Sequence, residues 1–449
     1  MVNTLKIKDN KIALCYLIYI FTFITKIRIS KSQCEKTTPY LRNNICSSNI
    51  CEDNELLDNS CIIGNSIIKT QWINNILIFN ESNYWSGEFA VNDDGDMIIE
   101  YSSKGFERLF YGLKNDGSYY FNNDSNHTKI INIESSYRFE SKNIFIYINN
   151  KQYLFSIGTF ISVSELYDLE NIDAYSIKGT SEFLGFEIFS YAYSILKLET
   201  SSPKEYLIIC TYTNSDEGDT IALKKFSFNQ NNFDGIQISS SSTNIYNNDY
   251  RSRVVSGFTM NSLIIIFYLG KLDSFEGYII KIYNFNLEEQ NTNLLDAGYS
   301  ISGFEKGKGL FSKSICLNEN EKIAVFIFYT STNSNENPYS VVGNIDDNFN
   351  FIKKVTKKIE GYNFISTGYL LNDLIKINDN RFAFITVSSD QKTIYILIFD
   401  LYDSYNKMKI RIYQPNLNKY KYVKGISTVM YNNYLAFSST VILPSSSDE

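Results

Sequence analysis

The stretch LIKINDNRFAFITVS, residues 374–388, places two apolar arms on either side of a polar turn. The stretch SICLNENEKIAVFIFYT, residues 314–330, repeats this plan. Looser copies begin at Phe89, Tyr137, Leu196, Gly257 and Gly425. The strongly apolar second arms begin near Met97, Ile144, Leu207, Leu263, Ile323, Phe382 and Leu435, about 56 residues apart on average. Each copy predicts a short strand, a tight turn and a buried strand.

Further strand-like runs follow most copies. A third apolar run is TIYILIFDL after residue 392, and a more polar fourth run is KMKIRIY after residue 406. Four antiparallel strands per unit, repeated around a ring, describe a β-propeller. The sequence therefore predicts an all-β protein, a β-propeller of about seven (six to eight) four-stranded blades. The alternative all-β architecture is a pair of tandem β-sandwiches.

The repeat domain is expected to span residues 65–445. Its last unit is short, because little chain follows the strand that begins near Leu435. Propeller edges must be closed or covered. We expect a segment within residues 67–89 to complete the terminal blade.

The N-terminus has the pattern of an export signal. Lysines at positions 6, 8 and 11 precede the apolar run Ile12–Ile24, which is too short to span a bilayer comfortably. Residues 1–32 are thus predicted to be a signal peptide, cleaved between Thr25 and Gln33, with an uncleaved anchor as the alternative. The mature chain is expected to be secreted or to lie on the extracellular face of the cell surface. It is expected to have no membrane span, unless a longer chain continues beyond Glu449.

Cysteines and glycosylation triplets agree with export. Four of the seven cysteines cluster in residues 33–64, which we interpret as a small disulfide-rich cap: Cys34, Cys46, Cys51 and Cys61. Four cysteines allow three pairings, and the sequence does not choose among them. Cys210 and Cys316 lie in apolar strands and are interpreted as small buried residues. The predicted glycosylation sites are Asn80, Asn123 and Asn126.

The acidic loop NDDGD at residues 92–96 has two interpretations. Asp-Gly is a strong hairpin signal, which favours a simple turn between two strands. Calcium is the alternative, since Asp93, Asp94 and Asp96 offer hard oxygen ligands. The corresponding turn of a later unit holds Asp379 and Arg381, which we expect to be exposed to solvent.

No catalytic signature is present. The single histidine, His127, lies within a glycosylation triplet, so triads and multi-histidine metal sites are disfavoured. A net charge of −7 disfavours nucleic acid and anionic membranes as partners. No cofactor is expected.

The function that fits these observations is non-enzymatic binding of a protein or a glycan through the propeller. One alternative is a propeller glycoside hydrolase, which would need two carboxylates about 5 to 10 Å apart in an axial pocket. Another is a structural coat component, for which no pocket is expected. The sequence leaves the ligand and the oligomeric state open.

Overall fold

The chain forms β-strands throughout the part that the structure describes. This computed structural model describes the backbone of residues 20–21, 24–29, 40–42, 45–47, 61–63, 68–73, 85–102, 107–116, 118–121, 128–132, 141–148, 151–158, 164–167, 174–177, 190–198, 205–214, 218–228, 238–246, 255–295, 312–330, 337–365, 371–414, 422–431 and 434–442. Within these ranges no helix is long and apolar enough to cross a bilayer.

Six antiparallel sheets each contain four strands that follow one another in sequence. The first three sheets comprise β7 (Trp85–Val91), β8 (Met97–Ser102), β9 (Glu107–Leu113), β10 (Thr128–Asn132); β11 (Ser141–Ile148), β12 (Lys151–Gly158), β13 (Ser164–Tyr167), β14 (Ala174–Ile177); and β15 (Ser190–Leu198), β16 (Glu205–Asn214), β17 (Gly218–Phe228), β18 (Ile238–Tyr246).

The next three sheets are built in the same way. They comprise β19 (Val255–Met260), β20 (Leu263–Leu272), β21 (Phe275–Asn284), β22 (Glu289–Leu294); β23 (Ser312–Asn318), β24 (Ile323–Phe328), β25 (Tyr339–Ile345), β26 (Phe351–Lys358); and β27 (Asp373–Asn378), β28 (Arg381–Val387), β29 (Ile394–Tyr402), β30 (Lys407–Tyr413).

A further sheet joins the two ends of the chain. Here β31 (Tyr422–Tyr431) pairs with β32 (Tyr434–Ile442), whose other edge pairs with β1 (Ile20–Phe21) and β2 (Ile24–Ile29). The next strand, β6 (Ile68–Ile73), pairs with β2. The expected closing segment within residues 67–89 is therefore in this sheet, with β2 between it and β32.

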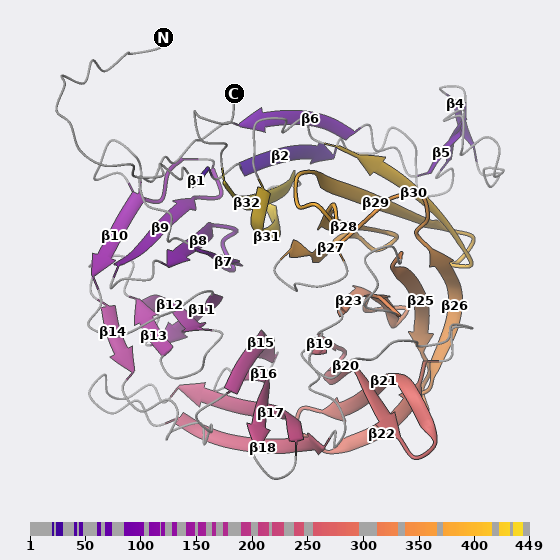
Figure 1. Ribbon diagram of the computed structural model, residues 1–449, viewed down its shortest axis with the longest axis horizontal. Coiled ribbons are helices and arrows are strands. Elements are labelled where there is room, and N and C mark those ends of the chain that lie inside the picture. The colour runs from indigo at the N-terminus through magenta and orange to yellow at the C-terminus, as the bar shows by residue number, and fades with distance from the viewer. Residues whose placement is uncertain are drawn as a thin grey trace.

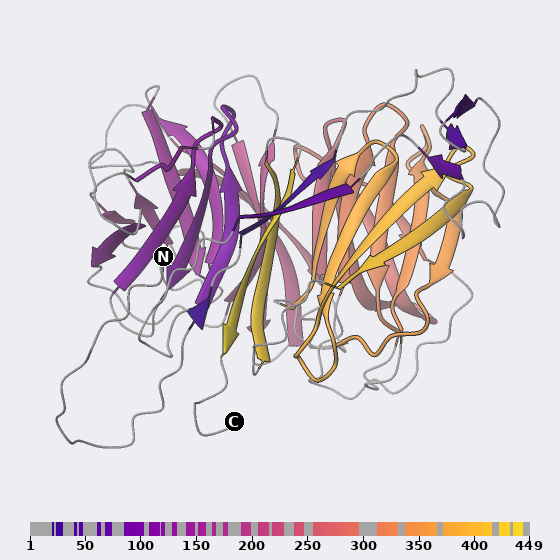
Figure 2. The ribbon, with the colours of Figure 1, turned by 90° about the horizontal axis from the view of Figure 1, so that it is seen from above.

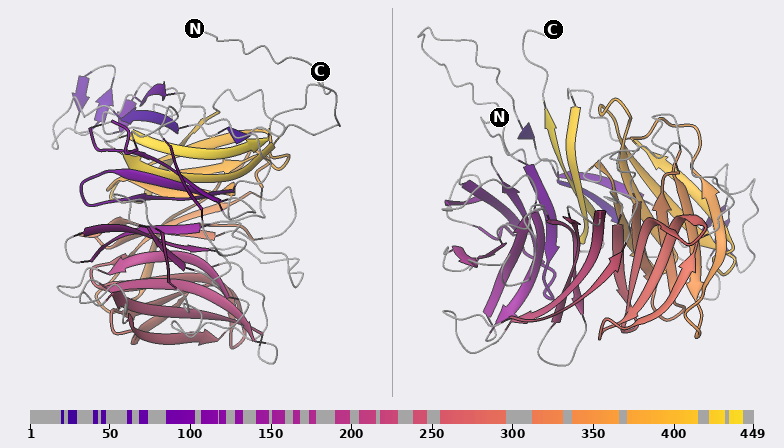
Figure 3. Two further views of the ribbon diagram at one scale, coloured as in Figure 1. Left: turned by 90° about the vertical axis from the view of Figure 1, so that its left-hand side faces the viewer. Right: turned by 60° about the horizontal axis from the view of Figure 1, so that its bottom comes forward.

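The sheets are arranged in a ring (Figure 1). The views from other sides show neighbouring sheets packed face to face around this ring (Figures 2 and 3). The first strand of each sheet lies nearest the axis, where neighbouring first strands contact one another in turn. The all-β prediction and the β-propeller prediction are confirmed, and the tandem-sandwich alternative does not describe this arrangement.

One strand assignment was wrong. The strand beginning near Ile144 was expected to be the second of its unit, but Ile144 lies in β11, the first strand of its sheet. The actual hairpin joins β11 to β12, which pair from Ile148 and Lys151 outward. The polar residues before β11 resemble a hairpin turn in composition, and composition alone does not separate a hairpin from a connection between sheets.

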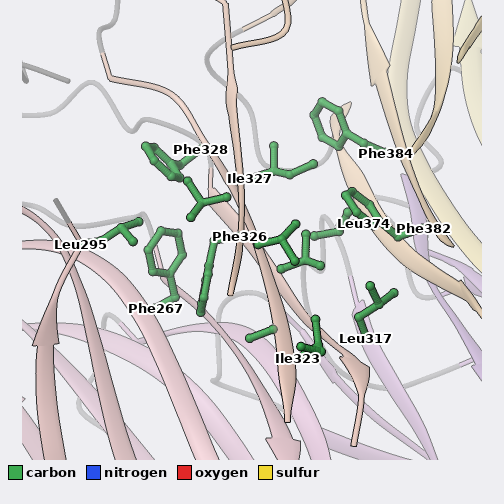
Figure 4. Packing of buried hydrophobic residues seen from close by; sticks show 14 of the residues in the cluster. Phe267, Leu295, Leu317, Ile323, Phe326, Ile327, Phe328, Leu374, Phe382 and Phe384 are labelled. Atoms are coloured by element: carbon green, nitrogen blue, oxygen red, sulfur yellow. The ribbon is translucent and has the colours of Figure 1, made fainter. Parts of the chain in front are cut away.

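Buried second and third strands form the core between sheets. In β24, every residue of IAVFIF is buried, and β28 is buried along its whole length. Figure 4 shows Phe267 of β20 and Phe326 of β24 packed together, and their ring centroids are 4.6 Å apart. Strands covered on both faces need no polar alternation, which explains the continuous apolar runs in the sequence.

Arg381 is buried rather than exposed, so the expectation for this residue was wrong. Its side chain is 3% exposed and forms an ion pair with Asp400, its cross-strand partner on β29. Arg411 on β30 pairs with the other carboxylate oxygen of Asp400 at 2.5 Å. Two guanidinium groups and one carboxylate thus connect three strands inside the sheet, and each charge has a partner, as burial requires. Asp379 is 64% exposed, as expected.

The predicted cap contains a small sheet. Strand β3 (Tyr40–Arg42) lies between β4 (Ile45–Ser47) and β5 (Cys61–Ile63), which places Cys46 and Cys61 on strands at opposite sides of β3. The side chains of Cys34, Cys46, Cys51 and Cys61 lie outside the described part, as do Asn80, Asn123, Asn126 and His127. The disulfide and glycosylation predictions therefore stay predictions.

Candidate functional site: the axial pocket

A pocket of about 300 Å³ lies at the axis of the ring. Six first strands supply its walls: β7, β15, β19, β23, β27 and β31. The chain brings these strands together because each begins a sheet, and the sheets pack side by side with their first strands innermost. The pocket thus combines residues from Phe89 to Thr428, almost the whole length of the propeller.

Short hydroxyl side chains dominate the polar part of the wall. They are Ser194, Ser256, Ser312, Ser314, Ser427 and Thr428. Apolar residues, among them Phe89, Leu196 and Phe258, alternate with them. At Gly257 of β19, a Cβ atom would lie 2.8 Å from the backbone oxygen of Ile265 on β20 and 2.6 Å from the side chain of Ile209 on the neighbouring sheet, so a larger residue would displace the backbone of β20.

Hydrogen bonds between neighbouring sheets run around the pocket. The Ser256 and Ser314 hydroxyls are 2.9 Å apart and connect β19 to β23. The backbone nitrogen of Phe89 on β7 donates to the Ser427 hydroxyl on β31 at 2.9 Å. These contacts join first strands that no backbone ladder connects, and they hold the wall in one geometry.

Asp373 is the most highly connected residue of the wall. Its Oδ2 atom accepts hydrogen bonds from the backbone nitrogen and the hydroxyl of Thr428 on β31. Its Oδ1 atom accepts from the backbone nitrogen of Leu374 and lies 3.7 Å from Lys313 Nζ on β23. The side chains of Lys313 and Asp373 are 19% and 20% exposed. One carboxylate therefore connects three sheets and partly offsets the lysine charge.

Two groups remain able to contact a ligand. The Ser312 hydroxyl has no hydrogen-bond partner among the described residues, although Ser312 is only 6% exposed. The Lys313 ammonium group has three N–H donors, and a single loose ion pair at 3.7 Å does not use all of them. Together with the apolar walls, these donors suit a small polar group more than an apolar one.

The arrangement does not provide a pair of catalytic carboxylates. Asp373 is the only acidic residue among those that line the pocket in the described part of the chain. A retaining or inverting glycosidase needs two carboxyl groups on either side of the scissile bond. Because Asp373 is engaged by Thr428 and Lys313, it is placed to stabilise the wall rather than to exchange a proton with a substrate.

The three aspartates of the NDDGD loop lie in the hairpin between β7 and β8. Asp96 accepts hydrogen bonds from the Asn92 side chain at 3.1 Å and from the backbone nitrogen of Asn115 at 2.7 Å. Asp93 pairs with Lys197 at 2.8 Å. Gly95 has a φ of +84°, the left-handed conformation that this turn requires. The described residues contain no group of three acidic, histidine or cysteine side chains arranged to hold a metal ion.

Sequence reasoning missed every residue of the axial pocket. Ser312, Lys313 and Asp373 lie at the starts of β23 and β27 and resemble the ordinary polar ends of strands. A usable signal is positional: small or hydroxyl residues recur in the first strand of the repeat, as in GISTVM of β31 and SKSICL of β23.

No family model matches the sequence, and no curated protein matches it significantly. Among solved structures, the WD40 domain of coronin from Toxoplasma gondii is 9% identical, covers 82% of this chain and 86% of that chain, and has a TM-score of 0.42. The β-propeller domain of Nup133 from Vanderwaltozyma polyspora is 9% identical, with coverage of 79% and 93% and a TM-score of 0.44.

A third similar structure is a fungal lectin from Aleuria aurantia, described as a six-bladed β-propeller with a fucose recognition mode. It is 8% identical, covers 74% of this chain and 95% of that chain, and has a TM-score of 0.40. All three are β-propellers, and at these identities and TM-scores nothing about the ligand of this chain follows from them.

Proposed function

We propose that the chain is a non-enzymatic binding protein, secreted or held at the cell surface, whose seven-bladed propeller recognises a protein or a glycan. In this proposal the sheet formed by both ends of the chain acts as the seventh blade. The axial pocket receives a polar group of the ligand.

The observation that carries this proposal is the composition of the pocket wall. Hydroxyl groups and one ammonium group can donate hydrogen bonds to sugar hydroxyls or to peptide carbonyls, while Phe89 and Leu196 cover apolar parts of the ligand. The wall is preorganised by hydrogen bonds between sheets, which lowers the entropic cost of binding. The unpartnered hydroxyl of Ser312 supports binding, because a ligand that accepts its proton removes the cost of a buried unpaired donor.

The test uses the full chain made in an oxidising secretory host and a printed panel of glycans and peptides. Bound ligands are then measured by calorimetry against the wild type and the variant Ser312→Val. We expect Ser312→Val to weaken binding about tenfold, the cost of one lost buried hydrogen bond. The control Ser404→Ala changes an exposed hydroxyl in the turn before β30 and should leave binding unchanged.

Three results would overturn the proposal. The first is an absence of saturable binding to any member of the panel. The second is equal affinity of Ser312→Val and wild type for the bound ligand. The third is turnover of a glycoside or an ester by the purified chain, which would restore an enzymatic function.

A further inference from the structure

The outer strands of two neighbouring sheets form a basic surface on an acidic protein. The chain as a whole carries 42 basic and 49 acidic residues. Strand β26, FIKKVTKK, has four lysines in eight residues and no acidic residue. Strand β30, KMKIRIY, also has no acidic residue. Four exposed lysines of these strands form what we call the lysine belt: Lys354, Lys357, Lys358 and Lys407.

The two strands lie next to each other at the rim of the ring (Figure 1). Lys357 Nζ of β26 donates to the backbone oxygen of Met408 on β30 at 3.4 Å, which joins the two sheets at this point. Lys358 Nζ lies 5.7 Å from the centre of the Tyr339 ring. Neither a carbonyl nor a neutral ring removes the positive charge, so these contacts orient the lysines and leave their charge available.

No belt lysine forms an ion pair with a carboxylate in the part of the chain that the structure describes. In the turn before β26, Asp346 accepts hydrogen bonds from the backbone nitrogens of Asn348 and Asn350, and Asp347 pairs with Lys322 at 2.6 Å. Asp400, beneath β30, is buried between Arg381 and Arg411. Glu360 and Asp403 follow and precede the two strands, outside the strands themselves.

Protection of a sheet edge explains part of this pattern. Lysines and bulges on outer strands prevent edge-to-edge association, and β26 has a bulge at Lys354. Edge protection does not require four lysines in this ring, since the outer strand β22, EQNTNL, contains none. The density of lysines on β26 therefore calls for a further cause.

We propose that the lysine belt binds a linear acidic glycan, one that carries carboxylate or sulfate groups along its length. The lysines from Lys354 to Lys358 extend over about 13 Å at the rise of a β-strand, a length that suits several anionic groups of an extended chain. Single-stranded nucleic acid is favoured by exposed aromatic residues on which bases stack. The aromatic residues of these two strands, Phe351 and Tyr413, pack against the core clusters instead.

The lysine belt is separate from the axial pocket. A local cluster of charge, rather than the net charge of −7 over the whole chain, sets the field that an anionic polymer meets at the belt. Failure of the belt proposal leaves the pocket proposal standing, and the two are measured with different variants.

The experiment compares full-chain wild type with two double variants of equal net charge. The belt variant is Lys354→Gln with Lys358→Gln. The matched control is Lys114→Gln with Lys392→Gln, two exposed lysines in turns that also hold Asp116 and Asp390. The probes are dextran sulfate and polygalacturonate, with phosphatidylserine vesicles and duplex DNA as the other polyanions and uncharged dextran as the blank. Binding is measured over a series of salt concentrations, and thermal unfolding verifies that both variants are folded.

We expect the belt variant to bind both polysaccharides about thirtyfold more weakly near 50 mM salt. The slope of log K against the logarithm of salt concentration should become less steep by roughly 1.5. The control should bind within about twofold of wild type. Equal losses in both variants, or no polyanion binding by wild type, would overturn the proposal. Tighter binding to phosphatidylserine vesicles or to duplex DNA than to either polysaccharide would also overturn it.

Discussion

Asp373 of β27 and Thr428 of β31 form the most complete contact between two first strands at the axis. The Thr428 backbone nitrogen donates to Asp373 Oδ2 at 2.8 Å, and the Thr428 hydroxyl donates to the same oxygen at 2.5 Å. The contact joins the sheet of strands β27 to β30 to the sheet in which β31 and β32 pair with the N-terminal strands. Closure of the ring therefore depends on this pair as well as on backbone pairing.

Asp373→Ala should destabilise the fold by about 1–3 kcal/mol, because it leaves the Thr428 backbone nitrogen and the Lys313 ammonium group without their carboxylate. Thr428→Val removes only the hydroxyl donor and should cost about 1 kcal/mol. Denaturant unfolding followed by tryptophan fluorescence measures both. If Thr428→Val lowered the free energy of unfolding as much as Asp373→Ala, the hydrogen bond from the Thr428 backbone nitrogen to Asp373 would contribute nothing to stability.

Asp400→Asn should be far more damaging, at about 3–5 kcal/mol, because Arg381 and Arg411 would keep their charges inside the sheet without a counter-charge. The control is Asp379→Asn in the same sheet, where Asp379 pairs with Lys376 at 2.8 Å on the exposed surface. Loss of that pair should cost less than 1 kcal/mol. Similar unfolding midpoints for the two variants would contradict the assigned role of Asp400.

Cys210 and Cys316 should resist thiol reagents at pH 8 in the folded protein. Burial raises the pKa of each thiol to about 12 from its usual 9.0, so little reactive thiolate is present. Without reductant, we expect two thiols to be labelled once the exported chain is unfolded. Four further labelled thiols would show that the cysteines at 34, 46, 51 and 61 are not in disulfides.

The same thiols predict alkaline instability. The folded-state pKa lies above the unfolded-state value, so the stabilisation is complete below about pH 9 and is lost as pH rises toward 12. Burial raises the pKa of Tyr206 to about 12, which acts in the same direction. Thermal midpoints measured at intervals of pH check this. An unfolding temperature that stayed constant from pH 8 to pH 11 would contradict it.

Export would change the sheet that closes the ring. Cleavage between Thr25 and Gln33 would remove β1 and residues of β2, the strand that now lies between β32 and β6. We expect mass spectrometry of the secreted chain to find its N-terminus in that range. We also expect hydrogen exchange to show Tyr434 and Leu435 still protected, with β6 paired to β32 in place of β2. A secreted chain that retains residues 24–29 would contradict cleavage.

Calcium at millimolar concentration should leave the unfolding temperature unchanged. Asp96 already accepts two hydrogen bonds, and Asp93 pairs with Lys197, so the loop offers few free carboxylate oxygens. A saturable rise in the unfolding temperature that disappears in Asp94→Asn would reinstate the metal site.

The repeated pattern of two apolar arms around a polar turn was sufficient to predict strands, hairpins and the propeller. Hairpin turns and apolar strands depend on residues a few positions apart, so they can be predicted from the sequence pattern alone. Residues 92–96 and 378–381 form the turns that their composition predicts. The prediction failed at Ile144, where two polar segments compete for the same role and only sheet pairing selects one.

The site and the charged surfaces, in contrast, were decided by tertiary structure. Asp373, Lys313 and Thr428 lie 55 to 115 residues apart in sequence and meet only because the first strands of different sheets converge at the axis. Arg381 follows a polar turn and was expected in water, yet the pairing of β28 with β29 places it opposite Asp400. The lysines of β26 and β30 become one surface because two outer strands are neighbours at the rim. The sequence by itself determined which segments form strands, since that depends on residues a few positions apart, whereas the closing of the ring decided which residues share a pocket.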